Sequence, residues 1–114
     1  MPLVCLERIA TGRSGDKGDS SNVGIIARSD AAWAWIREHL TAAWVKQRGR
    51  EFVKGDVDRY EVPNLRALNF ILHDSLGGGG SASLLTDAQG KTHAQALLRC
   101  EVEVPEDVLT ATPE

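Results

Sequence analysis

Polar side chains that could do chemistry gather in one stretch, T-G-R-S-G-D-K-G-D-S-S-N-V-G-I-I-A-R (residues 11–28). Glycine recurs at every third position near its start (Gly12, Gly15 and Gly18), which lets the backbone approach a partner closely. The polar residues among and after these glycines are Arg13, Ser14, Asp16, Lys17, Asp19, Ser20, Ser21 and Asn22. No other part of the sequence combines so many polar groups with so permissive a backbone, so this stretch is the candidate site.

The spacing excludes the common glycine motifs. A phosphate-binding P-loop has its lysine directly after the second glycine, whereas Lys17 precedes Gly18. A dinucleotide fingerprint opens a helix with unevenly spaced glycines, and the stretch here leads into a strand-like apolar run. The calcium loop D-x-[DN]-x-[DN]-G is absent as well.

Three interpretations of the stretch stay open. Backbone N–H groups together with Arg13 and Lys17 could bind a phosphate or a carboxylate. Asp16 and Asp19 could instead hold a divalent cation, although two carboxylates need further ligands to complete its shell. Local turns and ion pairs could also fold the stretch on itself without any ligand. The spacing supports this last interpretation at least as well as the other two.

Composition bounds the class of protein. A chain of 114 residues with 42% hydrophobic and 25% charged residues suits one globular domain. The net charge is −3 and the cations form no stripe, so we expect neither a nucleic acid nor a membrane as partner. The sequence shows no membrane-length apolar run and no signal-peptide pattern, so we expect a cytoplasmic location. No cofactor is indicated, and whether the chain is an enzyme stays open.

Periodicity predicts the elements of the N-terminal half. Leu3–Ala10 and Val23–Ala27 are expected to be strands, most simply a hairpin joined by the glycine stretch. A helix capped by Ser29 or Asp30 should run to Leu40, with Trp33, Ile36 and Leu40 on its apolar stripe. Thr41 should cap a second, short helix.

The C-terminal half is expected to begin with a strand at Val57–Val62. Leu65–Leu76 carries a leucine stripe that favours a helix, with a strand over Leu68–Leu72 as the rival. Ser81–Thr86 and Lys91–Val104 should form a hairpin. The order β-β-α-α-β-α-β-β indicates an α+β fold with a mostly antiparallel sheet and helices packed on one face. Cys5 and Cys100 are expected to be buried free thiols, bridged only if the first and last strands are neighbours.

Three motifs resemble a known family. R-S-G-D-K-G-D-S-S-N-V-G-I-I-A-R, A-W-A-W-I-R-E-H-L and Y-E-V-P-N-L-R-A-L-N-F-I-L are similar to the C-terminal domain of the acyclic terpene utilisation proteins, the AtuA-type family. The resemblance extends from Leu3 to Val104 and includes the glycine run Gly77–Gly80 and D-A-Q-G-K. It implies a single ferredoxin-like sandwich over residues 1–104. Residues 105–114 are polar, so we expect them to form a frayed tail.

The resemblance also implies a function. Some organisms encode this domain as a small protein beside a large AtuA-type subunit, so we expect an accessory or assembly subunit in the catabolism of acyclic terpenoid or branched acyl compounds. The partner would be the large subunit, a second copy, or both. Trp35 and Phe70, off the apolar stripes of their expected helices, are the candidate contact residues.

The alternative is a small enzyme or ligand-binding domain. In it, the stretch Arg13–Asn22 would bind an anionic CoA-like or phosphate-like substrate, or a metal-bridged one. The resemblance adds two asparagines of N-L-R-A-L-N to the site. The candidate ligand-binding residues are Arg13, Ser14, Gly15, Asp16, Lys17, Gly18, Asp19, Asn22, Asn64 and Asn69.

Overall fold

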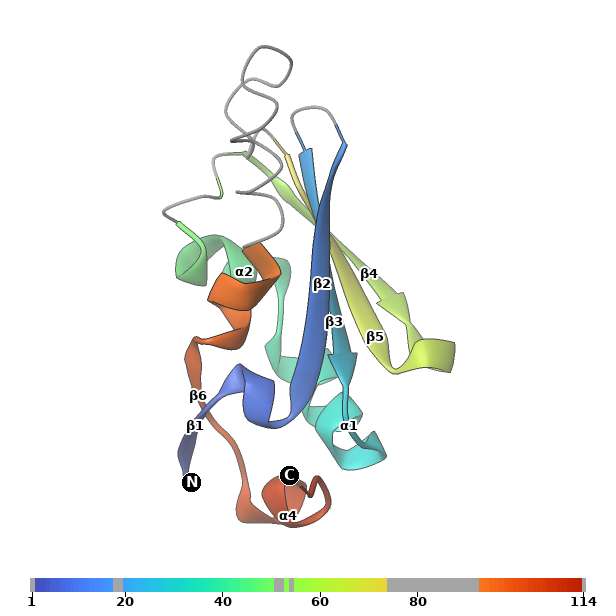
Figure 1. Ribbon diagram of the computed structural model, residues 1–114, viewed down its shortest axis with the longest axis vertical. Helices are drawn as coiled ribbons and strands as arrows, with labels where there is room; N and C mark the ends of the chain where they lie inside the picture. The colour runs from blue at the N-terminus through green and yellow to red at the C-terminus, as the bar shows by residue number, and fades with distance from the viewer. Residues whose placement is uncertain (1, 18–19, 51–52, 54, 74–92, 114) are drawn as a thin grey trace.

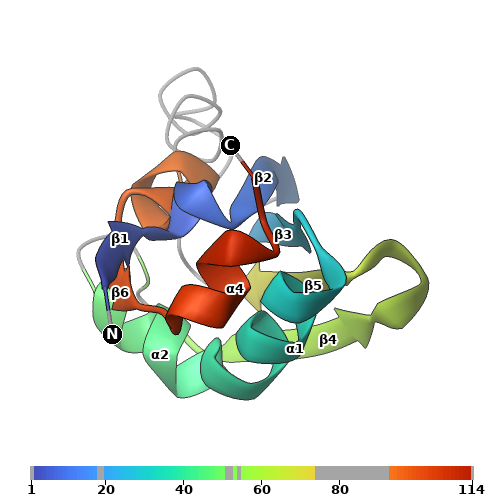
Figure 2. The same cartoon turned by 90° about the horizontal axis from the view of Figure 1, so that it is seen from below.

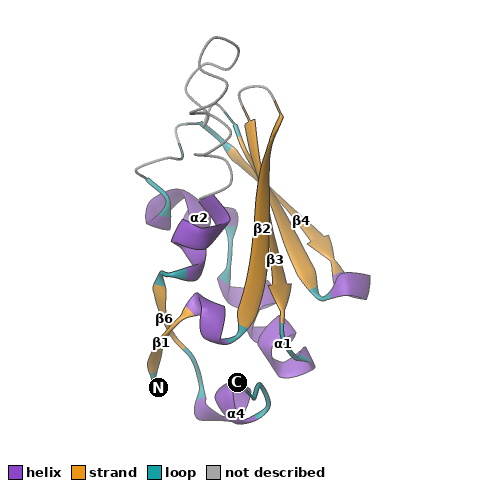
Figure 3. Ribbon diagram, viewed as in Figure 1, coloured by secondary structure: helices purple, strands orange, loops and turns teal. Residues whose placement is uncertain are grey.

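The structure is a computed structural model that describes residues 2–17, 20–50, 53, 55–73 and 93–113. Its described strands form two antiparallel sheets, one with the strand order β2-β3-β5-β4 and one that pairs β1 with β6 (Figure 1). The described α-helices lie on one side of the four-stranded sheet (Figure 3). The α+β class with helices on one face is therefore confirmed.

The glycine stretch is not a loop but most of a β-hairpin. β2 (Ala10–Lys17) pairs with β3 (Ser20–Ala27) in a register that runs from Ala10↔Ala27 to Lys17↔Ser20. The expected first strand ends at Cys5, because β1 (Leu3–Cys5) gives way to the 3-10 helix η1 (Leu6–Arg8) where Glu7 and Arg8 interrupt the alternation. A hairpin is present, but its first arm is the glycine stretch itself and not Leu3–Ala10, so the predicted strand boundaries are wrong.

The expected helix over Leu65–Leu76 is wrong, and its rival is confirmed as β5 (Ala67–Leu72). β5 is a central strand with β3 on one side and β4 (Val57–Val62) on the other. Leu68, Phe70 and Leu72 are fully buried on its inner face. A helix is stopped just before it by η2 (Pro63–Leu65) and by Arg66, whose φ of 53° is left-handed.

Both predicted helix caps are confirmed. Ser29 Oγ accepts a hydrogen bond from Ala32 N–H at the start of α1 (Asp30–His39), and Thr41 caps α2 (Ala42–Arg48) in the same way. The predicted stripe of α1 needs correction. Trp35 is only 8% exposed and shares the inner face with Ala32 and Ile36, while Trp33 is half-buried. Trp35 therefore lies on the buried stripe of α1 together with Ile36 and Leu40, and Trp33 lies at its margin.

The end of the chain also departs from expectation. Residues 93–98 are helical, and only β6 (Glu101–Glu103) is a strand within the predicted Lys91–Val104 strand. The predicted frayed tail forms α4 (Glu106–Thr110) instead. Arg8 holds this C-terminal helix in place. Its guanidinium donates hydrogen bonds to the carbonyls of Leu109, at 3.2 Å, and Thr112. The partner strand and the glycine run that the sequence predicts within residues 74–92 lie outside the described part.

The first and last described strands are neighbours, with Cys5 opposite Glu101. Both cysteines are free, as the sequence predicted. They are half-buried, whereas the sequence predicted that they would be buried. Burial raises the pKa of the Cys100 thiol, which keeps it protonated and weakly nucleophilic.

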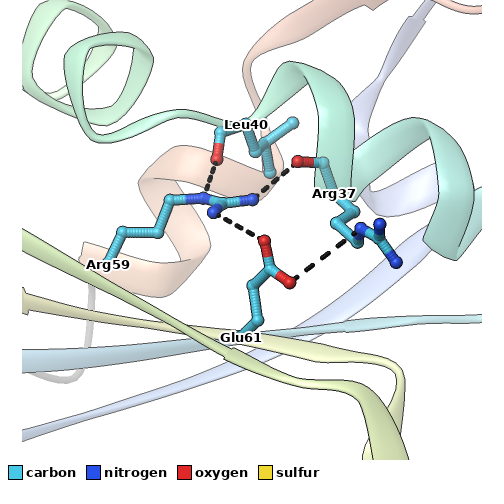
Figure 4. A network of polar contacts seen from close by, with 4 residues as sticks. All are labelled: Arg37, Leu40, Arg59 and Glu61. Carbon is cyan, nitrogen blue, oxygen red and sulfur yellow. Dashed lines mark hydrogen bonds and ion pairs between the residues drawn. The ribbon is translucent and has the colours of Figure 1, made fainter.

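One arginine ties the helix layer to the sheet (Figure 4). Arg59 lies on the inner side of β4 with its side chain only 21% exposed. Its guanidinium donates to the carbonyl of Leu40 at 2.9 Å and to that of Arg37 at 2.6 Å, and pairs with Glu61 at 3.1 Å. Carbonyls at a helix C-terminus have no partner within the helix, so Arg59 caps α1.

The described helices leave one face of the main sheet without helical cover. Viewed from below, α1, α2 and α4 gather on one side of the strands (Figure 2). The core between the layers is built from the largest fully buried side chains, among them Phe70, Leu6, Ile9, Ile25 and Ile36. None of the described helices is long and apolar enough to span a membrane.

Candidate functional site

The strand register divides the polar stretch between the two faces of the sheet. A Cβ on Gly12 would lie 3.2 Å from side-chain atoms of both Ile25 and Leu98, so Gly12 faces the helix layer. Arg13, the next residue, is exposed on the other face. The polar residues of β2 and β3 thus serve two separate environments, an outer face and an inner cluster.

On the outer face, one row of side chains crosses all four strands. The register aligns Arg13 with Gly24, Gly24 with Asn69, and Asn69 with Tyr60. The neighbouring row aligns Gly15 with Asn22. Three candidate polar residues, Arg13, Asn22 and Asn69, therefore share this face, as the sequence proposed for one site.

Two glycines hollow the middle of the outer face. A Cβ on Gly15 would meet nothing within 4 Å, and one on Gly24 would meet only Arg13 O at 3.9 Å. Gly24 lies between Arg13 and Asn69 in the register, and Gly15 lies beside Asn22 in the neighbouring row. Since the described residues leave space beside both glycines, this part of the face suits the close approach of a ligand or of another backbone.

The outer face offers hydrogen-bond donors to solvent. Arg13 makes no hydrogen bond or ion pair with the other described residues. Tyr60 is 53% exposed and Asn69 is half-buried. A guanidinium, an amide and a phenol in one row can bind a carboxylate or the carbonyl groups of a partner.

The inner cluster joins the stretch to the helix at residues 93–98. Ser21 is fully buried and His93 is 3% exposed, and Ser21 Oγ and His93 Nδ1 share a hydrogen bond of 2.8 Å. Ser14 Oγ accepts from Ala94 N–H at 3.4 Å. Among the candidates, the sequence singled out Ser14 but missed Ser21 and His93. The polar residues around Ser21 were the one sequence signal that could have pointed to Ser21. No such signal pointed to His93, which lies 72 residues further along the chain.

Burial lowers the pKa of His93 below its ordinary value. The unfolded chain therefore binds a proton at this histidine more readily than the folded chain does. The contribution of His93 to the free energy of unfolding is full above the unfolded pKa of about 6.5 and declines as the pH falls through and below that value.

We expect urea unfolding to show a lower free energy of unfolding at about pH 5 than at about pH 7.5. In His93→Gln, which keeps a polar partner for Ser21, this difference should be smaller because the titrating group is gone. Comparison with the wild type removes the contributions of all other titrating groups. An identical pH dependence in both proteins would contradict the assignment.

Comparison with known proteins decides the family. The sequence-family model of the AtuA ferredoxin-like domain matches residues 4–103 of the 114-residue chain. The chain belongs to this family. Its ferredoxin-like fold, which the resemblance implied, is thereby confirmed along with the family. No curated protein and no solved structure matches the chain.

The AtuA ferredoxin-like domain does not bring all candidate residues together. Asn64 is exposed on η2, beyond the pair Val62↔Ala67 and thus at the opposite end of the sheet from Asn22. Gly18 and Asp19 lie outside the described residues, as do the side chains of Asp16 and Lys17. The anion and metal interpretations of those residues stay predictions. Among the described residues, no three His, Cys, Asp or Glu side chains group as metal ligands.

The two candidate contact residues of this AtuA domain need correction. Phe70 is fully buried under the helix layer, because it points inward from β5 and not outward from a helix. Trp35 is 8% exposed, and its ring stacks on His39 with centroids 4.5 Å apart. Neither is an exposed surface residue of the kind the sequence predicted. Tyr60, which the sequence did not single out, is the exposed aromatic residue of the outer face.

Proposed function

We propose that this AtuA ferredoxin-like domain is an accessory subunit that binds a large AtuA-type protein through the outer face of its four-stranded sheet. The assembly would act in the catabolism of acyclic terpenoid or branched acyl compounds. The observation that carries the proposal is the row of Arg13, Gly24, Asn69 and Tyr60 on a face that no described helix covers.

The composition of this face favours a protein partner. Half-buried Ile26 and Ile71 lie beside the polar row, and exposed Tyr60 supplies an aromatic anchor. Interfaces combine such apolar patches with tyrosine and arginine, which are the residues that most often dominate binding. Gly15 and Gly24 would let the partner's backbone approach the sheet.

Arg13→Glu tests the proposal in a titration with a purified large AtuA-type protein. Losing the guanidinium and placing a carboxylate on the face should raise the dissociation constant at least about tenfold, because interfacial arginine contacts of this kind contribute more than 1 kcal/mol. Arg99→Glu is the matched control, since Arg99 is exposed at the end of the helix at residues 93–98, away from the outer face. Its dissociation constant should match that of the wild type. Equal weakening by both variants, or no binding of the wild type, would refute this function.

Arg13, which has no partner among the described residues, also supports the second candidate, a ligand-binding domain for a CoA-like or phosphate-like anion. The two functions separate in one calorimetric experiment. Heat on addition of coenzyme A, abolished by Arg13→Glu, together with no binding of the large protein, would favour the ligand function.

A further inference from the structure

A pocket on the helix side of the molecule is unrelated to the outer face. It has a volume of about 540 Å³ and lies where the C-terminal end of α1, the helix α2 and the strand β6 meet. In the view from below, β6 runs between β1 and α2 (Figure 2). Trp35 and Trp44 form its aromatic wall, and Leu3, which is 58% exposed, lies at its edge.

The pocket runs along the free edge of β6. Glu101, Val102 and Glu103 all line it, although successive side chains of a strand point to opposite faces. A cavity that follows the edge of the strand accounts for the three consecutive residues in its lining.

The hydrogen-bond pattern agrees with a free edge. Leu6 N–H donates to Cys100 O and Val104 N–H donates to Pro2 O, so the even-numbered positions of this segment face β1. In an antiparallel pair the alternate residues direct their N–H and C=O groups to the other side, which here is the pocket. Among the described residues, no backbone hydrogen bond outside the strand pairing involves Glu101 or Glu103.

The charges of the pocket select among possible occupants. The carboxylates of Glu101 and Glu103 are exposed and have no ion pair with any described residue. These two negative charges face one positive charge in the lining, the guanidinium of Arg48. That guanidinium lies 5.6 Å from the centre of the Trp44 ring. Among the described residues, His39 is the only other titratable group that lines the pocket, and its Nδ1 contacts Trp35 O at 2.9 Å.

We propose that β6 accepts an extended segment of a partner protein as an added strand, with a basic–apolar–basic alternation of side chains. Residues two apart on an added strand share a face, so two cations would lie beside Glu101 and Glu103. The residue between them would share the face of Val102, which is buried, and point to the aromatic wall. This site does not depend on the function proposed for the outer face.

The test uses short acetylated peptides with the core Lys-Leu-Lys, and the core Glu-Leu-Glu as control, followed by NMR. The first peptide should shift the resonances of the pocket residues and slow the amide hydrogen exchange of Glu101 and Glu103, since an added strand accepts hydrogen bonds from both N–H groups. The second peptide should do neither.

Glu103→Lys should weaken binding of the Lys-Leu-Lys peptide about fivefold, because it replaces a cross-strand attraction with a repulsion. Glu7→Lys makes the same charge change at an exposed residue outside the pocket and should have no effect. Equal binding of both peptides, unchanged amide exchange at the two glutamates, or full competition by tetramethylammonium would each overturn the proposal. The last result would identify a site for small organic cations instead.

Discussion

Gly12→Val lowers the free energy of unfolding by about 2–3 kcal/mol, the upper part of the range for overpacking a core. The Cβ alone would approach Gly24 O, Ile25 Cδ1 and Leu98 Cδ1, each at 3.2 Å. The added methyl groups would meet these atoms more closely. The backbone carbonyl belongs to β3, in the middle of the sheet, so the helix at residues 93–98 must move away.

Chemical denaturation followed by tryptophan fluorescence measures this loss. Gly15→Val is the matched control on the same strand, because a Cβ at Gly15 meets nothing within 4 Å. The control should stay within about 0.5 kcal/mol of the wild type. A similar loss in both variants would show that the strand disfavours valine generally, and the packing explanation would then be wrong.

Arg59→Ala should lower the free energy of unfolding by about 2 kcal/mol, because charged hydrogen bonds are lost and partly buried carbonyls lose their donor. The guanidinium bonds two backbone carbonyls near the end of α1, those of Arg37 and Leu40 (Figure 4). The loss should be visible in thermal unfolding as well as in urea.

Arg37→Ala separates this capping role from surface charge. The Arg37 side chain is 59% exposed and reaches Glu61 only at 3.9 Å, while its carbonyl, which Arg59 binds, is kept in the variant. An exposed ion pair of this length contributes less than about 0.5 kcal/mol. If Arg37→Ala cost as much as Arg59→Ala, the charge network rather than the cap would stabilise α1.

Structural features set by neighbouring residues were predictable from the sequence. Features set by residues far away in the sequence were not. Ser29 and Thr41 cap helices through hydrogen bonds to N–H groups three residues away, so the sequence alone places them. Leu68 and Leu72 fit a helix and a strand equally well. This segment forms the strand β5 because it pairs with β3 on one side and β4 on the other. No local sequence pattern shows which strands a segment will pair with.

The candidate site shows the same division. Composition pointed to the stretch that holds Arg13 and Asn22, and the family motif added Asn69. The sequence did not show that a hairpin would send Arg13 and Ser14 to opposite faces, because it predicted a loop there. His93 was out of reach, since its partner Ser21 is brought to it only by the packing of the helix at residues 93–98 on the sheet.

The contacts at the two ends of the chain bear on how the protein folds during synthesis. Arg8 bonds carbonyls 101 and 104 residues further along, and β1 pairs with β6. Thr112 also shares a hydrogen bond of 2.6 Å with Ser29, the cap of α1. The β2–β3 hairpin and the caps of α1 and α2 can form before residues 101–112 are synthesised, but these long-range contacts must wait until those residues have left the ribosome. The described fold is therefore completed late, and its assembly is slowed by non-local pairing more than by chain length.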